Sequence, residues 1–277
     1  MPELPEVETI VRGLRATLPQ RRILLVRLGK TDFVDNPAEI ERELPGRTIA
    51  AVERVGKFIR LRLDSQNRAA AAHLFVHLGM TGRLYTQAGD APALQHTHAF
   101  FVLDDGRELR YVDPRRFGRM AYVTGGALEQ FQSNLGAEPL EISLPAFRAL
   151  LAGRDAMIKA LLLNQQALRG IGNIYADESL WRARVHPKRL ASSLRHDEAG
   201  RLHAAIRKIL ADAIRLGGST ISDFVDAEGA PGEFQWKHKA YGREGKRCYR
   251  CGRKIRRIIV AGRSTHYCPQ CQRAPRR

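Results

Sequence analysis

Residues 248–271 read CYRCGRKIRRIIVAGRSTHYCPQC and hold all four cysteines of the 277-residue chain. Sixteen residues separate the first Cys-x2-Cys pair, Cys248 and Cys251, from the second, Cys268 and Cys271. Each pair can present two sulfur atoms from one turn, and two such turns complete the tetrahedral shell of a structural zinc ion. We therefore expect one structural Zn²⁺ bound by these four cysteines. Four free buried thiols are the alternative.

The segment between the two pairs is basic and has the composition of a two-stranded ribbon. Ile255 and residues 258–260 could form the strands, which would place Arg263 at the tip of the hairpin. Residues 237–277 contain 14 Lys or Arg and a single acid, so they carry +13 of the formal net charge of +17. Nucleic acid is the usual partner of such a cationic segment. We expect Arg263 to contact a phosphate or a groove, with a solvated arginine as the alternative.

Upstream of the ribbon the apolar residues repeat with a helical period. Leu202, Ile206 and Ile209 fall on one face of a helix predicted over residues 197–216, which Gly217 and Gly218 would end. Gly170-Ile171-Gly172-Asn173 precedes another predicted helix; glycines let a backbone approach a phosphate, and a helix N-terminus attracts an anion. Further helices are predicted over residues 147–151, 157–162 and 174–183, and a mobile loop over 226–232.

The first half of the chain has the pattern of a leading helix followed by strands. Val7, Ile10, Val11, Leu14 and Leu18 recur at helical spacing after Pro5. Asp104-Asp105-Gly106 is typical of a hairpin turn between two of the strands. Strands are predicted over residues 22–28, 57–63, 73–78, 98–103 and 108–112. The change of period predicts an α+β chain with a domain boundary near residues 136–144.

The N-terminus offers an unusual nucleophile. The chain begins Met1-Pro2-Glu3, and a small second residue permits removal of the initiator methionine. Pro2 would then carry a secondary amine, and an α-amine has a reference pKa near 8, well below that of lysine. Such an amine can condense with an aldehyde-level carbon to give an iminium. Most chains that start Met-Pro make no such use of the proline, which is the alternative.

Several motifs in a fixed order make the chain resemble the formamidopyrimidine-DNA glycosylases, which are bifunctional DNA glycosylases and AP lyases. The motifs other than the cysteine pattern are PELPEVET at 2–9, GKF at 56–58, HLGMTG at 77–82, DPRRFG at 113–118 and GIGNIYADESL at 170–180. The resemblance implies a β-sandwich catalytic domain with its leading helix over 1–136. It also implies a helix–two-turn–helix DNA-binding domain over 137–236 and a zinc-ribbon module over 237–277.

The resemblance assigns catalytic roles to the N-terminal residues. It implies that Pro2 attacks C1′ of the damaged nucleoside, and that β- and δ-elimination follow from the Schiff base. It implies that Glu3 is the acid–base residue, that Glu6 orients the site and that Lys57 lies near Pro2. Acidic side chains that complement a helix N-terminus are the alternative for Glu3 and Glu6. A solvent-facing lysine is the alternative for Lys57.

The resemblance also assigns DNA contacts. Extruding a base leaves a gap in the stack, and Met80, Arg115 and Phe117 match the residues that fill it. Without the family, Met80 and Phe117 would be interpreted as core residues. The other expected DNA contacts are His77, Arg116, Lys159, Asn173, Tyr241 and Arg263.

The sequence therefore predicts a base-excision repair enzyme that removes oxidised purines, 8-oxoguanine and formamidopyrimidines, from double-stranded DNA. One alternative is an endonuclease VIII-like enzyme for oxidised pyrimidines; that family usually begins Pro-Glu-Gly-Pro-Glu, whereas this chain has Leu4. Another is a non-catalytic zinc-ribbon DNA-binding protein. No apolar run of about 18 residues predicts a membrane span. We expect a monomer in the bacterial cytoplasm, associated with the nucleoid, because the acidic N-terminus is unlike a secretory leader.

Overall fold

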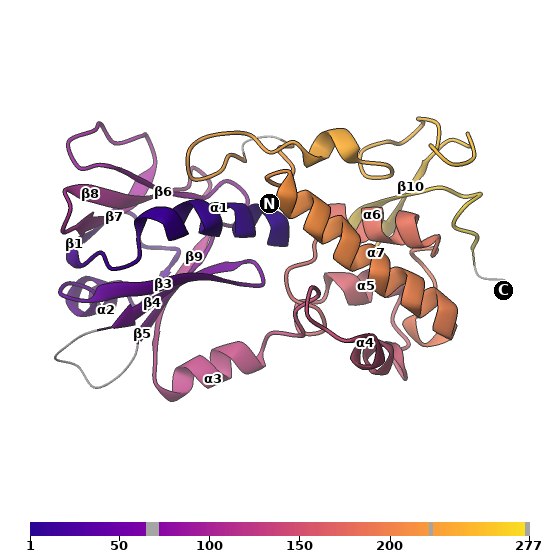
Figure 1. Ribbon diagram of the computed structural model, residues 1–277, viewed down its shortest axis with the longest axis horizontal. Coiled ribbons are helices and arrows are strands. Elements are labelled where there is room, and N and C mark those ends of the chain that lie inside the picture. The colour runs from indigo at the N-terminus through magenta and orange to yellow at the C-terminus, as the bar shows by residue number, and fades with distance from the viewer. Residues whose placement is uncertain (65–71, 222–223, 275–277) are drawn as a thin grey trace. The chain divides into compact units, whose positions relative to one another are not determined.

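The computed structural model describes residues 1–64, 72–221 and 224–274, and the chain divides into two units (Figure 1). Unit 1 comprises Met1–Asn134 and Gly217–Gly232, and unit 2 comprises Leu135–Leu216 and Glu233–Arg277. The first predicted domain boundary, after residue 136, lies two residues from this division. The segment 217–232, in contrast, was predicted within the helical domain and belongs to unit 1.

Unit 1 is a sandwich of two sheets with a leading helix, as predicted (Figure 1). The four-stranded sheet has the order β1 (Ile23–Leu28), β7 (Thr97–Leu103), β8 (Arg107–Val112), β6 (Arg83–Ala88). The five-stranded sheet has the order β2 (Val34–Asp35), β9 (Arg119–Thr124), β5 (Ala72–His77), β4 (Phe58–Asp64), β3 (Thr48–Val55). Its helices are α1 (Leu4–Thr17), α2 (Pro37–Glu43) and α3 (Gly126–Ser133).

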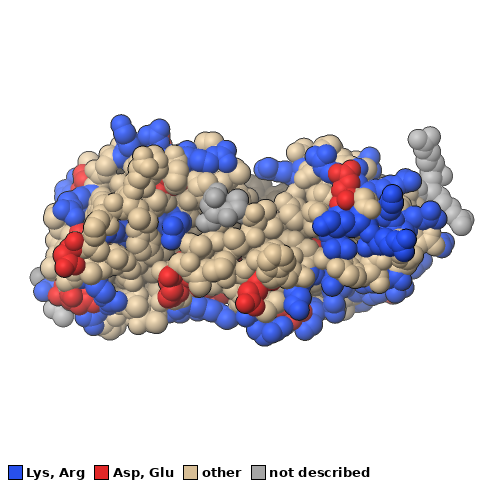
Figure 2. All heavy atoms as spheres, turned by 90° about the horizontal axis from the view of Figure 1, so that it is seen from above, with Lys and Arg blue, Asp and Glu red and all other residues tan. Residues whose placement is uncertain are grey.

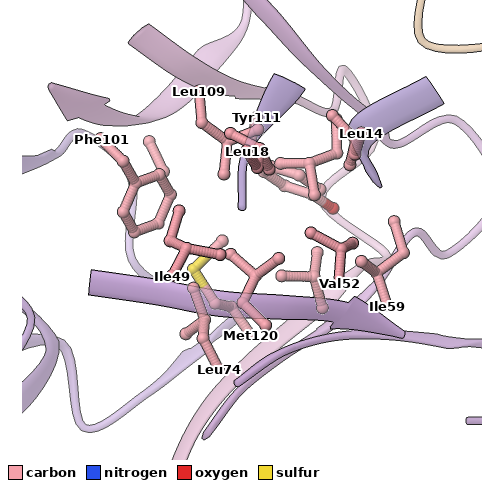
Figure 3. Close-up of a cluster of buried hydrophobic side chains, with 14 of the residues drawn as sticks. Leu14, Leu18, Ile49, Val52, Ile59, Leu74, Phe101, Leu109, Tyr111 and Met120 are labelled. Carbon is pink, nitrogen blue, oxygen red and sulfur yellow. The ribbon is translucent and has the colours of Figure 1, made fainter. Parts of the chain in front are cut away.

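Alternation along the strands supplies the core of unit 1. In β4, Ile59, Leu61 and Leu63 are fully buried while Arg62 between them is exposed. These side chains meet those of the other sheet and of the apolar face of α1, including Leu14 (Figure 3). Each such side chain contributes about 1.5–3 kcal/mol on burial. The predicted hairpin at 104–106 is present, because β7 and β8 pair antiparallel on either side of it.

Unit 2 contains the predicted helices and the predicted ribbon. The helices are α4 (Leu144–Leu151), α5 (Ile158–Leu163), α6 (Asn173–Ala183) and α7 (His196–Arg215), with short 3-10 turns η1 (Ala191–Ser193) and η2 (Phe234–Lys237). The apolar face of α7 is buried, and Gly217 and Gly218 follow its end with φ of 69° and 79°. Glycine adopts these left-handed angles without strain, which explains why the helix stops there.

The ribbon consists of β10 (Arg256–Val260) and β11 (Arg263–Tyr267), which pair antiparallel. The two residues of its turn, Ala261 and Gly262, have φ of 49° and 69°. Positive φ at both positions defines a type I′ turn, whose twist matches that of the strands. Arg263 therefore lies at the hairpin tip, as the sequence predicted. Among the described residues, no helix is both long and apolar enough to cross a bilayer.

Candidate active site

The first turn of α1 buries the predicted catalytic carboxylates. Pro2, Glu3 and Glu6 are all buried in unit 1. One carboxylate oxygen of Glu6 accepts the Glu3 backbone N–H at 2.8 Å, and the other accepts the Ser219 N–H at 2.7 Å. Gly218 lies so close that a Cβ on it would be 2.8 Å from the Glu6 carboxylate. Glu6 thus joins the N-terminus to the segment 217–232, which fits a residue that orients its neighbours.

Lys57 and His77 lie together at one end of β4 and β5. Phe58, which follows Lys57, pairs with His77 across the two strands. Lys57 is almost fully buried, and burial of His77 together with the Lys57 cation lowers the pKa of His77 to about 4. The His77 Nδ1 accepts the Gly79 N–H at 3.1 Å, so the neutral ring carries its proton on Nε2. His77 can therefore meet DNA as a neutral donor and not as a cation.

The candidate gap-filling residues protrude from unit 1 and are not part of its core. Met80 is 44% exposed and Phe117 is 56% exposed. The Arg115 guanidinium stacks on the Phe117 ring at 4.5 Å from the centroid. A Cβ on Gly79 would lie 2.4 Å from the Phe117 carbonyl carbon, so the two loops touch through their backbones. The interpretation of Met80 and Phe117 as core residues is wrong.

Asp113 organises both of these loops, although no sequence pattern had assigned it a role. Its buried carboxylate accepts the Thr81 hydroxyl at 2.6 Å and the Tyr111 hydroxyl at 3.1 Å. It also accepts the backbone N–H groups of Arg115 and Gly118 at 3.3 and 2.9 Å. A buried carboxylate with four donors holds the loop backbone in one arrangement.

Arg116 has a different environment from Arg115. It adopts a left-handed φ of 52°, and its exposed guanidinium lies 3.4 Å from the Asp32 carboxylate. Such an exposed pair contributes little to stability, so Arg116 can exchange Asp32 for a phosphate at small cost.

The four cysteines of unit 2 form a set that fits one zinc ion. Their Sγ atoms all lie within 4.8 Å of one another, and those of Cys251 and Cys268 are 3.4 Å apart. A tetrahedral ion with Zn–S bonds of about 2.3 Å needs sulfur separations of about 3.8 Å. Cys248 and Cys268 pack with Trp181, and Cys268 N–H bonds to the Gln272 side chain at 2.8 Å. A closed set of four sulfurs suits a structural ion.

Three family models match successive parts of the chain. They describe the formamidopyrimidine-DNA glycosylase N-terminal domain over residues 1–120, the formamidopyrimidine-DNA glycosylase H2TH domain over 135–225 and the zinc finger found in FPG and IleRS over 245–274. The chain belongs to the formamidopyrimidine-DNA glycosylase family. It is therefore a DNA glycosylase of base-excision repair with AP lyase activity, and its zinc finger holds one structural zinc.

Full-length formamidopyrimidine-DNA glycosylases from several bacteria resemble the chain. The protein of Herpetosiphon aurantiacus is 44% identical over 277 residues, covering 98% of this chain and 100% of the relative. The protein of Solibacter usitatus is 45% identical over 278 residues, covering 99% and 100%.

Solved structures of the family share the fold. A Lactococcus lactis FPG mutant in complex with Fapy-dG-containing DNA has a TM-score of 0.90 and 33% identity, covering 99% of this chain and 100% of that one. The MutM (FPG) protein of Thermus thermophilus has a TM-score of 0.85 and 43% identity, covering 98% of each chain. The predicted fold class is confirmed.

One residue that the family resemblance suggested for DNA contact lies in the interior of unit 2. Lys159 has no exposed surface, and its ammonium bonds to the Asp177 carboxylate at 2.6 Å, the Thr265 hydroxyl at 2.8 Å and the Ser264 carbonyl at 3.0 Å. A direct DNA contact does not fit a side chain with no exposed atom. The bonds instead join α5 and α6 to β11, which gives Lys159 a structural role.

Asp177 and Glu178, inside the helix motif of the family, were missed as functional positions. Asp177 accepts the backbone N–H of His266 at 2.8 Å. Glu178 accepts the N–H groups of three successive residues, Lys239, Ala240 and Tyr241, and burial raises its pKa although these bonds oppose the shift. Two adjacent acids within a buried helix were the available signal.

The remaining predicted contacts of unit 2 lie around these acids. Asn173 is the first residue of α6, directly after Gly172, as the phosphate-ligand prediction requires. The Tyr241 ring packs edge-on against His238 and His266, which fixes its direction. Arg263 is exposed at the ribbon tip.

Proposed function

We propose that the Pro2 amine, freed by removal of Met1, is the nucleophile of the glycosylase and lyase reactions. The observation that carries the proposal is the buried first turn of α1, where Glu6 bonds to both Glu3 N–H and Ser219 N–H beside Pro2. Met1 is half exposed and outside the core, so its loss removes no packed side chain. Both carboxylate oxygens of Glu6 fix this turn, so Pro2 loses little conformational freedom when it approaches its target.

The reaction follows from amine chemistry. The nitrogen lone pair of Pro2 forms a bond to C1′ as the bond from C1′ to the damaged base breaks, and the base leaves with a proton. The sugar ring opens to an iminium, which acidifies the C2′ proton. Loss of that proton breaks the C3′–O bond, and a second elimination breaks the C5′–O bond. Water then hydrolyses the remaining iminium and frees Pro2.

Glu3 is the proposed acid–base residue of these steps. Its carboxyl group is buried beside Pro2, where it can protonate the ring oxygen O4′ and later accept the C2′ proton. Lys57 supplies a buried cation next to a neutral His77, and we assign it the phosphate on the lesion side. This cation favours the approach of DNA to the nucleophile.

Base extrusion is assigned to the two protruding loops. Met80 and Phe117 expose apolar surface to water, which is unfavourable. Insertion between bases would remove this surface from water. Arg115, stacked on Phe117, can hydrogen-bond to the orphaned partner base. Arg116, Asn173, Tyr241 and Arg263 are the proposed phosphate or groove contacts.

The proposed substrate is an oxidised purine in double-stranded DNA. Among the similar structures, one Lactococcus lactis FPG is bound to Fapy-dG-containing DNA and a MutM protein to carbocyclic 8-oxo-G-containing DNA. Another Lactococcus lactis FPG is bound to DNA with an oxidised pyrimidine, so a substrate comparison is needed. We expect faster excision of 8-oxoguanine than of an oxidised pyrimidine in otherwise identical duplexes. Faster pyrimidine excision would favour the endonuclease VIII-like alternative.

Borohydride trapping tests the nucleophile. Reduction of the iminium on an 8-oxoguanine duplex should yield a covalent protein–DNA adduct of 1:1 stoichiometry. Pro2→Gly, which replaces the secondary amine by a primary one on a freer backbone, should strongly reduce the yield of this adduct. Glu3→Gln is the matched control, because it keeps the amine and should slow the reaction without preventing adduct formation on a preformed abasic site. An undiminished adduct with Pro2→Gly would remove Pro2 from its role, and no adduct from the parent chain would favour a non-catalytic DNA-binding protein.

We also propose that the enzyme acts as a monomer on nucleoid DNA in the bacterial cytoplasm. A single chain contains all of the residues assigned above, and no second copy is needed to complete the set. Light scattering at micromolar concentration should give a mass near 31.1 kDa. A mass near twice that value would exclude the monomer.

A further inference from the structure

The zinc end of the ribbon has a large basic concavity to which the proposed reaction gives no role. Its volume is about 1010 Å³, and it is lined by Glu244, Gly245, Arg247, Gln270 and the segment 251–257. Five of its side chains are cations and one, Glu244, is an acid. The cations are Arg247, Arg253, Lys254, Arg256 and Arg257, and all are exposed. Lys and Arg gather densely over the C-terminal module (Figure 2).

These cations lack the partners that arginines have elsewhere in the chain. On unit 1, for example, Arg54 is paired with the partly buried carboxylate of Glu8, and Arg110 with the buried carboxylate of Glu108. Within the described part of the chain, no ion pair is formed by Arg253, Lys254 or Arg256. Five cations against a single carboxylate around one concavity leave an excess of positive charge and produce a positive potential. An anion bound there would offset this excess charge.

The concavity is separate from the contacts assigned to the lesion duplex. β11 is the strand that faces α6, since the His266 N–H bonds to Asp177 of that helix, and α6 begins with Asn173. β10 is the outer strand, and its first residue, Arg256, pairs with Tyr267 beside the zinc cysteines. At about 3.3 Å per residue, Arg256 lies roughly 13 Å along the ribbon from Val260 and the tip. The concavity is therefore at the opposite end of the ribbon from Arg263.

We propose that this concavity binds the phosphates of a second stretch of DNA, one that is not in the active site. A volume of this size exceeds that of one phosphate and suits several consecutive phosphates of a backbone. The zinc cluster fixes the loops that carry the cations, so binding requires little ordering. The enzyme could then hold one duplex at the ribbon while another occupies the active site, and could pass between them without release.

The inference is tested on a full-length, zinc-loaded protein whose active site is already filled. A short duplex with a stable tetrahydrofuran abasic site is bound first, so the test does not depend on Pro2 chemistry. A second, fluorescent undamaged duplex is then titrated, and its binding is followed by anisotropy and by the stoichiometry in native mass spectrometry. We expect a complex with one duplex of each kind.

Two triple variants locate the second site. The test variant is Arg253→Gln, Lys254→Gln, Arg256→Gln; the charge-matched control is Arg22→Gln, Arg62→Gln, Arg207→Gln, at exposed positions outside the concavity. The test variant should weaken second-duplex binding at least tenfold. It should also lower the slope of log K against log salt by about 0.9 for each phosphate that is no longer neutralised. The control variant should change the affinity by less than threefold.

Each other outcome overturns the inference in a different way. Absence of a ternary complex with the parent protein would show that no second site exists. Equal weakening by both triple variants would show that only net charge matters. If polyglutamate displaced the second duplex as well as unlabelled DNA of the same total charge, the concavity would be assigned to acidic proteins instead of DNA. Loss of Pro2 trapping would affect the proposed reaction alone and leave this result unchanged.

Discussion

Among single residues, the buried Asp113 shows how one side chain can hold in place several exposed ones that we propose contact DNA. Its carboxylate bonds to both loops that carry the exposed Met80, Arg115 and Phe117. Asp113→Ala should lower the free energy of unfolding by about 2–4 kcal/mol, because four donors lose a buried acceptor. Urea unfolding measures this loss. Tyr111→Phe, which removes one of the four bonds, should cost about 1 kcal/mol.

The same substitution should separate base extrusion from strand cleavage. Asp113→Ala should slow excision of 8-oxoguanine at least tenfold in single-turnover experiments, since the loops would no longer hold the proposed gap-filling side chains. Cleavage of a preformed abasic site should slow much less, because no base remains to be extruded. Equal slowing on the two substrates would contradict a role of Asp113 in positioning these loops.

His238 should contribute to acid sensitivity. Burial between Phe234 and Tyr241 lowers its pKa to about 4, against 6.5 for the free side chain. Below pH 6.5 His238 becomes protonated in the unfolded chain but stays neutral in the folded chain. The free energy of unfolding therefore falls with pH until the pH reaches about 4. The loss is at most about 3 kcal/mol.

His238→Gln tests this dependence by thermal unfolding at about pH 7.5 and about pH 5, on either side of the ordinary histidine pKa. The variant should be less stable at both values because ring packing is lost. The diagnostic result is a smaller drop in Tm between the two pH values than in the parent protein. An unchanged drop would show that other histidines account for the sensitivity.

For single residues, the sequence predicted correctly those positions that depend only on the spacing of neighbouring residues in the chain. The two Cys-x2-Cys pairs and the tip position of Arg263 follow from short-range patterns, and the structure has both. Lys159 was predicted incorrectly as a DNA contact, because its partner Thr265 is 106 residues away and no local pattern reveals the pairing. Asp113 was missed for the same physical reason, since its bonds depend on two loops meeting.

Among the elements, those with a clear apolar period were predictable. β4 alternates strictly and α7 carries a continuous apolar face, and both were predicted close to their bounds. β3 and α3 were not predicted. β3 contains two alanines and two charged residues, and α3 has no fully buried side chain. Such segments take their conformation from neighbours, here β4 and β9, and not from their own pattern.

The zinc ribbon should depend on its metal more than the helices do. Its small core consists of Trp181, Ala240, Ile255 and two of the cysteines. Too few apolar side chains are present to hold the module without the ion. Removal of zinc by a chelator should expose Trp181 and weaken duplex binding. The helical signal in circular dichroism, to which the long helix α7 contributes, should persist.

Tryptophan fluorescence can follow this change. The chain has two tryptophans, and Trp236 is 80% exposed whereas Trp181 is 7% exposed. In a Trp236→Phe variant the remaining emission reports the ribbon core alone, and it should shift to longer wavelength when zinc is removed and return when zinc is restored. No shift, or collapse of the helical signal, would contradict a locally metal-dependent module.

For the whole molecule, the main surprise is the path of the chain. Segment 217–232 follows the last helix of unit 2 in sequence yet belongs to unit 1, where Phe224 and Ala227 pack on the sandwich core. Glu6 completes the connection through Ser219. Bonds between residues 213 positions apart are not visible in sequence periodicity, so the prediction placed this segment with its nearest neighbours in the chain.

The net charge of +17 should make DNA binding strongly dependent on salt. Each neutralised phosphate contributes a slope of about 0.9 in log K against log salt, so about six contacts imply a loss of about a thousandfold between roughly 50 and 200 mM. Anisotropy with an undamaged duplex measures the slope. A flat dependence would contradict recognition through phosphates.

The contact between Gly79 and the Phe117 backbone has a consequence for protein engineering. Neither loop has room to shift against the other, since even one added carbon at position 79 would overlap the chain. Residues 78–82 and 113–118 therefore form a single cassette. Exchanging one of them with a homologous segment would disrupt the other, so a graft of either loop must transfer both at once.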